Sequence, residues 1–274
     1  MRREQTNETM PMQPYLVLET EDFQIKKEMK EGISHFYEFS RKTAGKEMKA
    51  VPDGSVDLLF EIGDHEVKTY IGGTVLAAKG WAFAEERAYF GVRFQPGACI
   101  LPKELSIRDL VDKDLEIDGN LFGEHLTEKL AESRNISERV NIFMTEYEKI
   151  YGKQRMDGIH ALEAYVRNRI YATQGTIQLQ RLVEETGYSA CYIRRIFGQI
   201  HGISPKNFEK FIRFQNTLHR LTQKPGTCRL DRLALACGYY DEAHMIKDFK
   251  QFAGITPQGY GRLVAGTKIA EMEG

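Results

Sequence analysis

Two short segments of the sequence, beginning near residues 190 and 242, carry polar side chains on one side of an expected helix. In the first, Ile193, Ile196 and Phe197 recur at helical spacing and form an apolar back. The opposite face is left to Ala190, Cys191, Arg194 and Arg195 in the first segment, and to Glu242, Ala243, His244 and Lys247 in the second. A short helix with an apolar back and a polar front fits the DNA major groove, where side chains form hydrogen bonds with base edges. The chemistry that these residues suit is therefore recognition of DNA bases.

Both segments belong to a repeat. "GYSACYIRRIFGQIHGISP" (187–205) is followed about fifty residues later by "GYYDEAHMIKDFKQFAGITP" (238–257). Each unit reads as a short helix, a glycine turn, a second helix and a stop made of glycine, isoleucine, a hydroxyl residue and proline. This order predicts a helix-turn-helix. A plain helical repeat with a structural or protein-binding role is the alternative, but such arrays normally need three or more repeats to bury a core.

The turns of the two units have the residues that a helix-turn-helix requires. Gly187 and Gly238 stand where a helix ends and the backbone favours a positive φ. Ser189 and Asp241 can cap the helix that follows each turn. We therefore expect both glycines in the left-handed region and both caps to be formed.

One long helix is expected between the units, over "SPKNFEKFIRFQNTLHRL" (204–221), with Ser204 as its cap and Pro205 in its first turn. A helix of about 17 residues is about 25 Å long. Two successive major-groove segments on one side of DNA lie about 34 Å apart. The spacing therefore predicts that one monomer presents two reading helices to two neighbouring grooves.

The two units and the helix between them resemble the DNA-binding domain of the AraC/XylS transcription regulators. The second unit, "ALACGYYDEAHMIKDFKQFAGITPQGYGRL", is similar to that family's signature, including its closing aromatic and arginine, Tyr260 and Arg262. The first unit resembles the family's first helix-turn-helix, and the match covers residues 156–264. The chain departs from the family pattern at Val183, Thr217 and Met245, which we interpret as changes of packing.

By position, the resemblance implies a set of DNA-contacting residues. They are Ala190, Cys191, Tyr192, Arg194, Arg195, Lys206, Glu242, Ala243, His244 and Lys247. Arginine can bind guanine O6 and N7 together, and glutamate can accept from cytosine N4. Tyr192, Arg181 and Lys206 would contact phosphates or simply lie on the surface. Ala243 and Ile246 donate no side-chain hydrogen bond, so the second helix is expected to read fewer bases and mostly to grip phosphates.

The first half of the sequence predicts a β-rich unit followed by helices. Strand-like runs occupy 55–62, 67–78 and 88–97, with Gly72-Gly73 as a hairpin turn or a flexible joint, and short strands at this spacing are typical of a barrel or sandwich. Helical spacing appears at 121–130 and again at 137–150, where Ser137 is the expected cap. "VPDGSVDLLFEIGD" (51–64) and "FGVRFQPGA" (90–98) resemble an uncharacterised domain found in front of some AraC-type regulators. That resemblance implies a cupin-like β-barrel that binds an effector, and a helical pair that dimerises.

Candidate ligand-binding residues in this half are few. Trp81, Tyr89, Arg93 and Phe94 could line an effector pocket, with Arg93 meeting an anionic effector. Alternatively Trp81 and Phe94 belong to the core, and Arg93 pairs with a nearby carboxylate. The acidic residues Asp53, Asp57, Glu61 and Asp64 are expected along a solvated strand edge.

No catalytic residue, metal or cofactor is expected in this half. A metal-binding cupin would need a His-x-His pair, a Glu and a further His, whereas His35 and His65 are isolated and His125 falls in the predicted helices. An enzymatic, metal cupin-like N-terminal domain fused to a DNA-binding module is nevertheless the alternative function.

Composition and charge are consistent with two domains. Of the 274 residues, 42% are apolar and 28% are charged, and the net charge is −1. Residues 155–274 contain 17 Lys and Arg against 11 Asp and Glu, a net of +6, whereas residues 1–154 carry −7. A basic half suggests an anionic partner. No apolar run reaches the ~18 residues of a membrane span, no signal peptide is visible, and the four cysteines have no CxxC spacing, as expected for small buried residues in a reducing cytosol.

These observations predict an α+β chain of two domains. Residues 1–154 would form a sensor or dimerisation domain, β-rich over 15–115 and helical over 120–151. Residues 155–274 would form the DNA-binding domain, with helix-turn-helix units at 176–201 and 229–252 and a linking helix at 204–222. The resemblance implies a cytoplasmic bacterial transcription regulator, an activator that binds double-stranded DNA as a homodimer, contacts RNA polymerase and responds to a small-molecule effector. A front domain that only dimerises is the close alternative.

Overall fold

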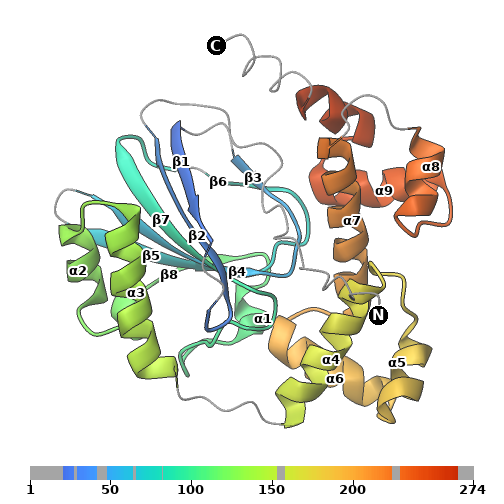
Figure 1. The fold of residues 1–274 in the computed structure, drawn as a ribbon, viewed down its shortest axis with the longest axis horizontal. Helices are drawn as coiled ribbons and strands as arrows, with labels where there is room; N and C mark the ends of the chain where they lie inside the picture. The colour runs from blue at the N-terminus through green and yellow to red at the C-terminus, as the bar shows by residue number, and fades with distance from the viewer. Residues whose placement is uncertain are drawn as a thin grey trace, which may run out of the picture.

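The computed structural model describes residues 21–27, 30–41, 48–63, 66–81, 83–152, 158–223 and 229–264. These residues form two parts that lie side by side (Figure 1). The N-terminal part, up to residue 152, is an antiparallel sheet covered on one face by helices. The helical part, residues 158–264, is arranged around one long helix. The predicted boundary between residues 154 and 155 lies outside the described residues, as do His65 and Asp64.

The main sheet has six strands. They are β1 (Glu21–Lys26), β2 (Ile33–Arg41), β4 (Val56–Ile62), β5 (Val67–Gly72), β7 (Arg87–Phe94) and β8 (Asp114–Ile117), in the order β1-β2-β7-β4-β5-β8. Neighbouring strands of this sheet all run antiparallel. Within the described residues β1 and β8 each have one neighbour in this sheet, so it stays open. The predicted α+β fold is confirmed, but the closed barrel is wrong, because the two edge strands do not meet.

The side chains of β7 alternate between the two faces of the sheet and are buried on both, as in a central strand. Phe90, Val92 and Phe94 point to one face and join the main hydrophobic core of the N-terminal part. Tyr89 and Arg93 point to the opposite face. Gly91 lies between them because the ring of Tyr37 on β2 occupies its place: a Cβ atom there would approach Tyr37 Cζ to 2.0 Å.

Two helices cover the first of these faces, which we call the α3 face. They are α2 (Leu126–Glu132) and α3 (Ile136–Tyr151), whose apolar sides pack on the sheet. The predicted helix over 121–130 is interrupted: a 3-10 turn, η1 (Gly119–Phe122), ends before His125, which has a φ of 51°. The cap of α3 is Asn135, whose side chain accepts from the Glu138 amide at 3.0 Å. The prediction of Ser137 as this cap is therefore wrong by two residues.

A two-stranded sheet faces the other side of the main sheet, which we call the β6 face. It consists of β3 (Met48–Ala50) and β6 (Lys79–Trp81). Phe83, just after β6, packs edge-on against Phe39 and Tyr89 of the main sheet, with ring centroids 5.0 and 4.8 Å away. The predicted strand over 67–78 ends at Gly72, and residues 73–78 lead away to β6, so Gly72-Gly73 is not a hairpin turn.

The helical part contains two helix pairs joined by a long helix. Its helices are α4 (Gly158–Ala172), α5 (Leu179–Thr186), α6 (Ala190–His201), α7 (Pro205–Gln223), α8 (Leu230–Ala236) and α9 (Glu242–Ala253). α7 stands between the α5–α6 pair at one end and the α8–α9 pair at the other (Figure 1). Its residues Phe208, Phe211, Phe214 and Leu218 are buried in a single cluster with residues of both pairs. The expected fold of two helix-turn-helix units on one linking helix is confirmed.

The two parts are in direct contact. Val51 of the N-terminal part lies in the hydrophobic cluster of the helical part. The Gln215 side chain of α7 donates to the Pro52 carbonyl at 2.9 Å. Phe208 lies so close to Gly54 that a Cβ atom there would approach its ring to 2.6 Å. The short helix α1 (Ile107–Leu110) packs against α6. The loop of residues 51–54 is therefore the main bridge from the sheet to α7.

Candidate nucleic-acid interface

Local signals fix the turn of the first unit. Gly187 ends α5 with a φ of 73° and donates its amide to the Val183 carbonyl, and Ser189 caps α6 by accepting from the Tyr192 amide at 3.2 Å. The second unit repeats this arrangement: Gly238 has a φ of 77°, and Asp241 caps α9 by accepting from the His244 amide at 2.7 Å. The expected glycine conformations and both caps are confirmed.

Replacing Ser189 by alanine is expected to lower the free energy of unfolding by about 1 kcal/mol, because the Tyr192 amide loses its partner. The same loss is expected from Asp241→Ala at α9. Urea denaturation followed by circular dichroism measures both. Gln199→Ala, at an exposed position inside α6 away from its cap, is the control. Equal stability of the wild type and both cap variants would contradict this account.

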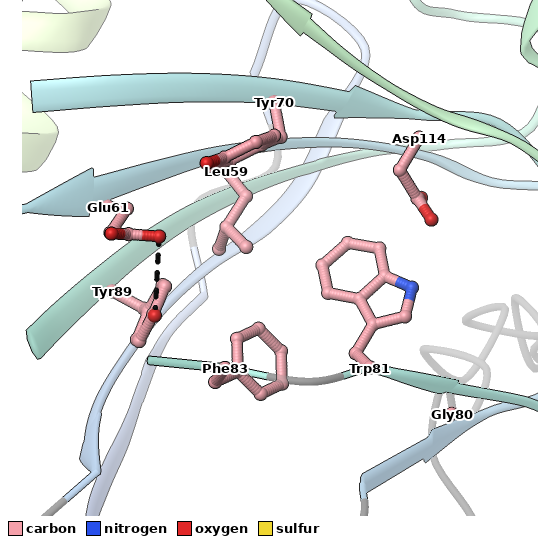
Figure 2. Close-up of a pocket in the computed structure, with 8 residues that line it drawn as sticks. All are labelled: Leu59, Glu61, Tyr70, Gly80, Trp81, Phe83, Tyr89 and Asp114. Carbon is pink, nitrogen blue, oxygen red and sulfur yellow. Dashed lines mark hydrogen bonds between the residues drawn. The ribbon is translucent and has the colours of Figure 1, made fainter. Parts of the chain in front are cut away.

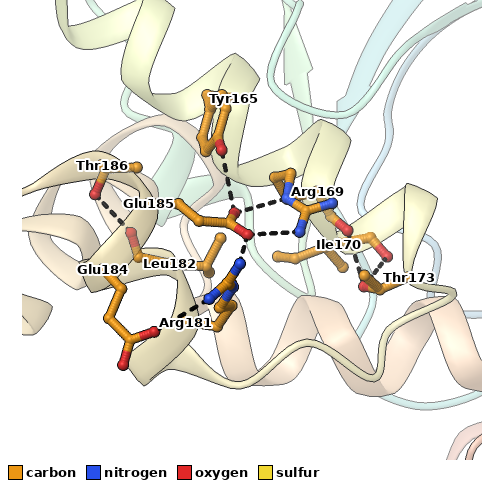
Figure 3. A network of polar contacts seen from close by, with 9 residues as sticks. All are labelled: Tyr165, Arg169, Ile170, Thr173, Arg181, Leu182, Glu184, Glu185 and Thr186. Carbon is orange, nitrogen blue, oxygen red and sulfur yellow. Dashed lines mark hydrogen bonds and ion pairs between the residues drawn. The ribbon is translucent and has the colours of Figure 1, made fainter.

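A cluster around Glu185 holds α5 against α4 (Figure 3). Arg169 donates to both carboxylate oxygens of Glu185 at 2.7 Å, and Arg181 Nε and Tyr165 Oη donate to them at 3.0 and 3.1 Å. The hydrogen bond from Arg169, above all, holds the pKa of Glu185 down at about 2. Arg181 also contacts Glu184, so this residue, predicted as a phosphate contact or plain surface, is engaged by two carboxylates.

This cluster could not be predicted from the repeat, because Tyr165 and Arg169 lie on α4, which the repeat does not include. The available signal was the spacing of Arg181 and Glu185, which are four residues apart on one helix.

The polar face of α6 is exposed. Ile193, Ile196 and Phe197 are buried as predicted, whereas Cys191, Arg194 and Arg195 are exposed and Ala190 and Tyr192 are partly exposed. The Arg195 guanidinium stacks over the Tyr192 ring at 4.9 Å, and the Tyr188 ring stacks on Tyr192 at 5.1 Å. Arg194 forms no ion pair with another of the described residues. The structure thus brings the predicted residues of the first helix together on one accessible surface.

The polar face of α9 is less free than that of α6. Ala243 and Lys247 are exposed, and Glu242 and His244 are partly buried. His244 Nε2 lies 3.6 Å from the buried Asp248 carboxylate one turn along, and its ring meets the Tyr239 ring edge-on at 5.3 Å. These contacts fix the orientation of His244. Of the predicted residues on α9, Lys247 is the most accessible donor.

Lys206 lies at the start of α7, where the Ser204 side chain caps the helix by accepting from the Asn207 amide at 3.1 Å. The Lys206 side chain is largely exposed, and its ammonium lies 3.6 Å from the buried Glu209. Burial raises the pKa of Glu209, while Lys206 and Arg213 oppose the rise. Lys206 is therefore on the same part of the molecule as α6, but it already has a carboxylate beside it.

Two residues that the repeat aligns have different surroundings. Tyr188 is 46% exposed, whereas Tyr239 is 3% exposed. The Arg213 guanidinium of α7 lies over the Tyr239 ring at 5.5 Å, because α7 passes this side of the second unit. The two units are therefore alike in backbone conformation, but their tyrosines have different environments.

The four residues predicted to line an effector pocket are brought together only in part: Trp81 lines one hollow with Tyr89 and another with Arg93, whereas Phe94 lies apart. Phe94 is fully buried in the α3-face core, where it contacts Tyr147. Arg93 points to the β6 face and forms ion pairs with Asp53 and Asp57. Trp81 and Tyr89 line one cavity on that face (Figure 2). The alternative in which Arg93 pairs with carboxylates is therefore the one that the structure has, and Asp53 and Asp57 do not lie along a solvated edge.

The described residues show neither a membrane-spanning helix nor a metal-binding cluster. No helix among them is long and apolar enough to cross a lipid bilayer. Within the same residues, no three His, Cys, Asp or Glu side chains are grouped as a metal ion would require. Cys99, Cys191 and Cys237 are free thiols, and of these Cys191 is exposed, not buried as expected.

Comparisons with known proteins agree with this arrangement. A family model described as a helix-turn-helix domain matches residues 182–262, and one described as a domain of unknown function (DUF6597) matches residues 22–116. No curated protein matches.

Several solved structures are similar. One is entitled "probable AraC family transcriptional regulator" from Rhodopseudomonas palustris CGA009; it is 25% identical over 38% of this chain and 97% of its own, with a TM-score of 0.35. Another is the C-terminal domain of AraT, a response regulator from Geobacillus stearothermophilus, at 22% identity over 40% and 88%, with a TM-score of 0.34. A third is fatty acid-bound ToxT from Vibrio cholerae strain SCE256, at 12% identity over 91% and 99%, with a TM-score of 0.41.

Proposed function

Since this chain carries a helix-turn-helix domain of the AraC type, we propose that it regulates transcription by reading two successive major-groove segments with α6 and α9. The observation that carries the proposal is the pair of helix-turn-helix units, each with a buried back and an accessible polar front, on one linking helix. α7 has 19 residues. At 1.5 Å per residue it spans about 28 Å, which approaches the ~34 Å between successive grooves.

The surface of α6 supports base reading by the first unit. Arg194 is exposed and carries the fork of donors that binds guanine O6 and N7. Arg195 lies against Tyr192, so its guanidinium is partly ordered before DNA arrives. Each good bidentate pair contributes about 1–3 kcal/mol of discrimination between bases. Arg194 is accordingly the residue to which we assign most of the sequence preference of the first unit.

The surface of α9 supports a mixed role for the second unit. Glu242 stands in its first turn and could accept from cytosine N4, and Lys247 is an exposed donor for phosphate. Ala243 offers only apolar contact. The second unit would therefore read fewer positions than the first and hold the DNA mainly by its backbone.

The N-terminal part is proposed to control how these helices are presented, as a sensor of an effector, as a dimerisation domain, or as both. The bridge of residues 51–54 supports this role, because any movement of the sheet reaches α7 through Pro52 and Gly54. Activation of transcription, contact with RNA polymerase and assembly as a homodimer belong to the same proposal. Size measurement in solution and a promoter-reporter assay test these finer points.

A DNA-binding selection on the purified full chain tests the proposal. The wild type is expected to enrich a motif of two blocks about one helical turn apart, at a stated salt concentration. Arg194→Ala is expected to weaken the base preference in one block by about 1–3 kcal/mol, and Glu242→Ala is expected to weaken it in the other block.

Lys103→Ala, which removes one exposed positive charge from the N-terminal part, is the control and is expected to leave the motif unchanged. If Arg194→Ala alone blurs the motif, α9 acts only as a clamp. A wild type that enriches no motif even at low salt would overturn the proposal.

A further inference from the structure

A cavity lies on the β6 face of the main sheet, in the N-terminal part. Its volume is about 270 Å³. Leu59, Tyr70 and Tyr89 of the main sheet form one wall, and Trp81 and Phe83 of the β6 segment face them (Figure 2). The volume is close to the lower end of the ~300–1,000 Å³ usual for small-molecule sites. The cavity therefore suits a compact ligand with an apolar body.

The charged groups that line this cavity among the described residues are both carboxylates, Glu61 and Asp114. Glu61 accepts from the Tyr89 hydroxyl at 3.3 Å, and Arg87 Nε lies 4.0 Å from it. Lys79 pairs with Asp114 from outside the lining. No Lys or Arg of the described residues is among those that line the cavity itself.

The two tyrosines of the wall are affected by both burial and this negative charge. Burial and the charge of Glu61 raise the pKa of Tyr89 to about 12, and both also raise the pKa of Tyr70. An anionic ligand would meet the same two carboxylates. Arg93, for which one of the two alternatives was to receive such a ligand, pairs with Asp53 and Asp57 and does not line this cavity.

We propose that this cavity binds a small organic cation, an amine or a quaternary ammonium compound with an apolar body. Aromatic walls attract a cation through the faces of their rings, and Glu61 supplies the compensating charge. The Trp81 indole N–H adds a point of recognition. It is buried without a hydrogen-bond partner among the described residues, and it turns toward Asp114 at one end of the cavity (Figure 2). A hydroxyl or carbonyl oxygen on the ligand would satisfy it.

The strand that brings Trp81 to the cavity begins beside the helical part. Trp81 ends β6, and Ala78, which directly precedes that strand, packs against the hydrophobic cluster of the helical part. Ala78 Cβ lies 3.9 Å from the position of a Cβ atom at Gly254, the residue that ends α9. A ligand wedged between Trp81 and the sheet would act on a strand anchored at the second helix-turn-helix unit. This regulatory step, unlike cation binding itself, rests on the proposed function.

Trp81 makes the binding measurable, because it is the one tryptophan among the 274 residues. The full chain would be titrated with benzyltrimethylammonium, benzylamine and tetramethylammonium, and with benzyl alcohol and benzoate, while tryptophan fluorescence is recorded. Benzyltrimethylammonium or benzylamine is expected to give a saturable change, with affinity at least about tenfold above that of benzyl alcohol. Benzoate is expected to give none. The proposal is overturned if benzoate binds as tightly as the cations, or if none of the three cations binds at millimolar concentration.

Two variants tie the signal to this site. Glu61→Gln keeps the size of the side chain and is expected to weaken cation binding about tenfold, with the affinity for benzyl alcohol unchanged. Glu132→Gln makes the same change at an exposed position on α2, on the other side of the sheet, and is expected to bind like the wild type. Phe83→Ala, which removes a ring from the wall without touching a charge, is expected to weaken both ligands. Wild-type cation affinity in Glu61→Gln would overturn the assignment.

A mobility-shift assay with and without the bound cation separates this inference from the proposed function. A changed affinity for DNA in the wild type, lost in Glu61→Gln, supports the regulatory step. Saturable cation binding with unchanged DNA affinity keeps the site and removes that step. Cation binding by a chain that binds no DNA would instead remove the proposed function and leave the cation site standing.

Discussion

Arg93→Ala is expected to lower the free energy of unfolding by about 3–5 kcal/mol, the usual effect of removing one partner from a buried ion pair. Arg93 is 5% exposed, and its guanidinium contacts the Asp53 and Asp57 carboxylates. Asp53 is 3% exposed and also accepts from the Ser55 amide at 2.9 Å. Without Arg93 these carboxylates keep their burial but lose the opposing charge. Urea denaturation at pH 7 measures the loss.

The pH dependence of this loss has a definite sign. Burial already raises the pKa of Asp57 in the wild type, and Arg93 opposes that rise. In Arg93→Ala the rise is larger, so the folded state binds protons more tightly than the unfolded chain does. The variant should therefore recover stability relative to the wild type as the pH falls through the raised pKa of Asp57, since this carboxyl becomes neutral.

Two further proteins complete this test. Arg194→Ala removes the same charge at an exposed position and is expected to change stability by no more than about 0.5 kcal/mol. A variant that combines Arg93→Met with Asp53→Asn and Asp57→Asn leaves no charge to compensate and is expected to recover much of the loss. A stability loss that is the same at pH 7 and pH 4.5 would contradict the role given to the carboxylates.

The helix-turn-helix units could be predicted because their signals are local. A glycine that ends a helix, a serine or aspartate cap and an apolar period act within one or two turns of chain, and Gly187, Gly238, Ser189 and Asp241 do what their spacing indicates. The different environments of Tyr188 and Tyr239 could not be predicted in this way. Their difference depends on where α7 passes, which is a property of tertiary packing.

The N-terminal part could be predicted only in its strand segments. The alternation of 88–97 indicates a strand, but not that β7 lies between β2 and β4. This order sets Asp57 opposite Arg93 in the sheet. Trp81 lies across from Tyr89 because the chain returns over the sheet at β6. An anion-binding role for Arg93 would have to compete with the ion pairs that this arginine forms. An arginine and an aspartate 36 residues apart give no sequence signal of their contact.

The pairing of β2 with β7 sets His35 opposite Arg93. We expect this position to make the folded protein less stable in acid. His35 is 5% exposed, and burial, then the charges of Arg93 and Lys27, lower its pKa to about 3. The Ser34 hydroxyl lies 3.1 Å from its Nδ1, and the Tyr37 ring is 6.1 Å away. In the unfolded chain the pKa is about 6.5, so only the unfolded state gains a proton as the pH falls from about 6.5 towards about 3. His35 alone should therefore cost about 3 kcal/mol of stability by pH 4.5.

His35→Gln is expected to reduce this loss, because glutamine carries no titratable group and can still bond to Ser34. The free energies of unfolding of wild type and variant, measured by urea denaturation from pH 7 to pH 4.5, should converge or cross as the pH falls. Some slope will remain, since burial also lowers the pKa of His201 against the opposing effect of Glu163, 2.7 Å away. His160→Gln, at an exposed position in α4, should follow the wild type. If His35→Gln and the wild type lose stability in parallel, His35 is protonated in the folded protein, and the contact with Arg93 does not keep it neutral.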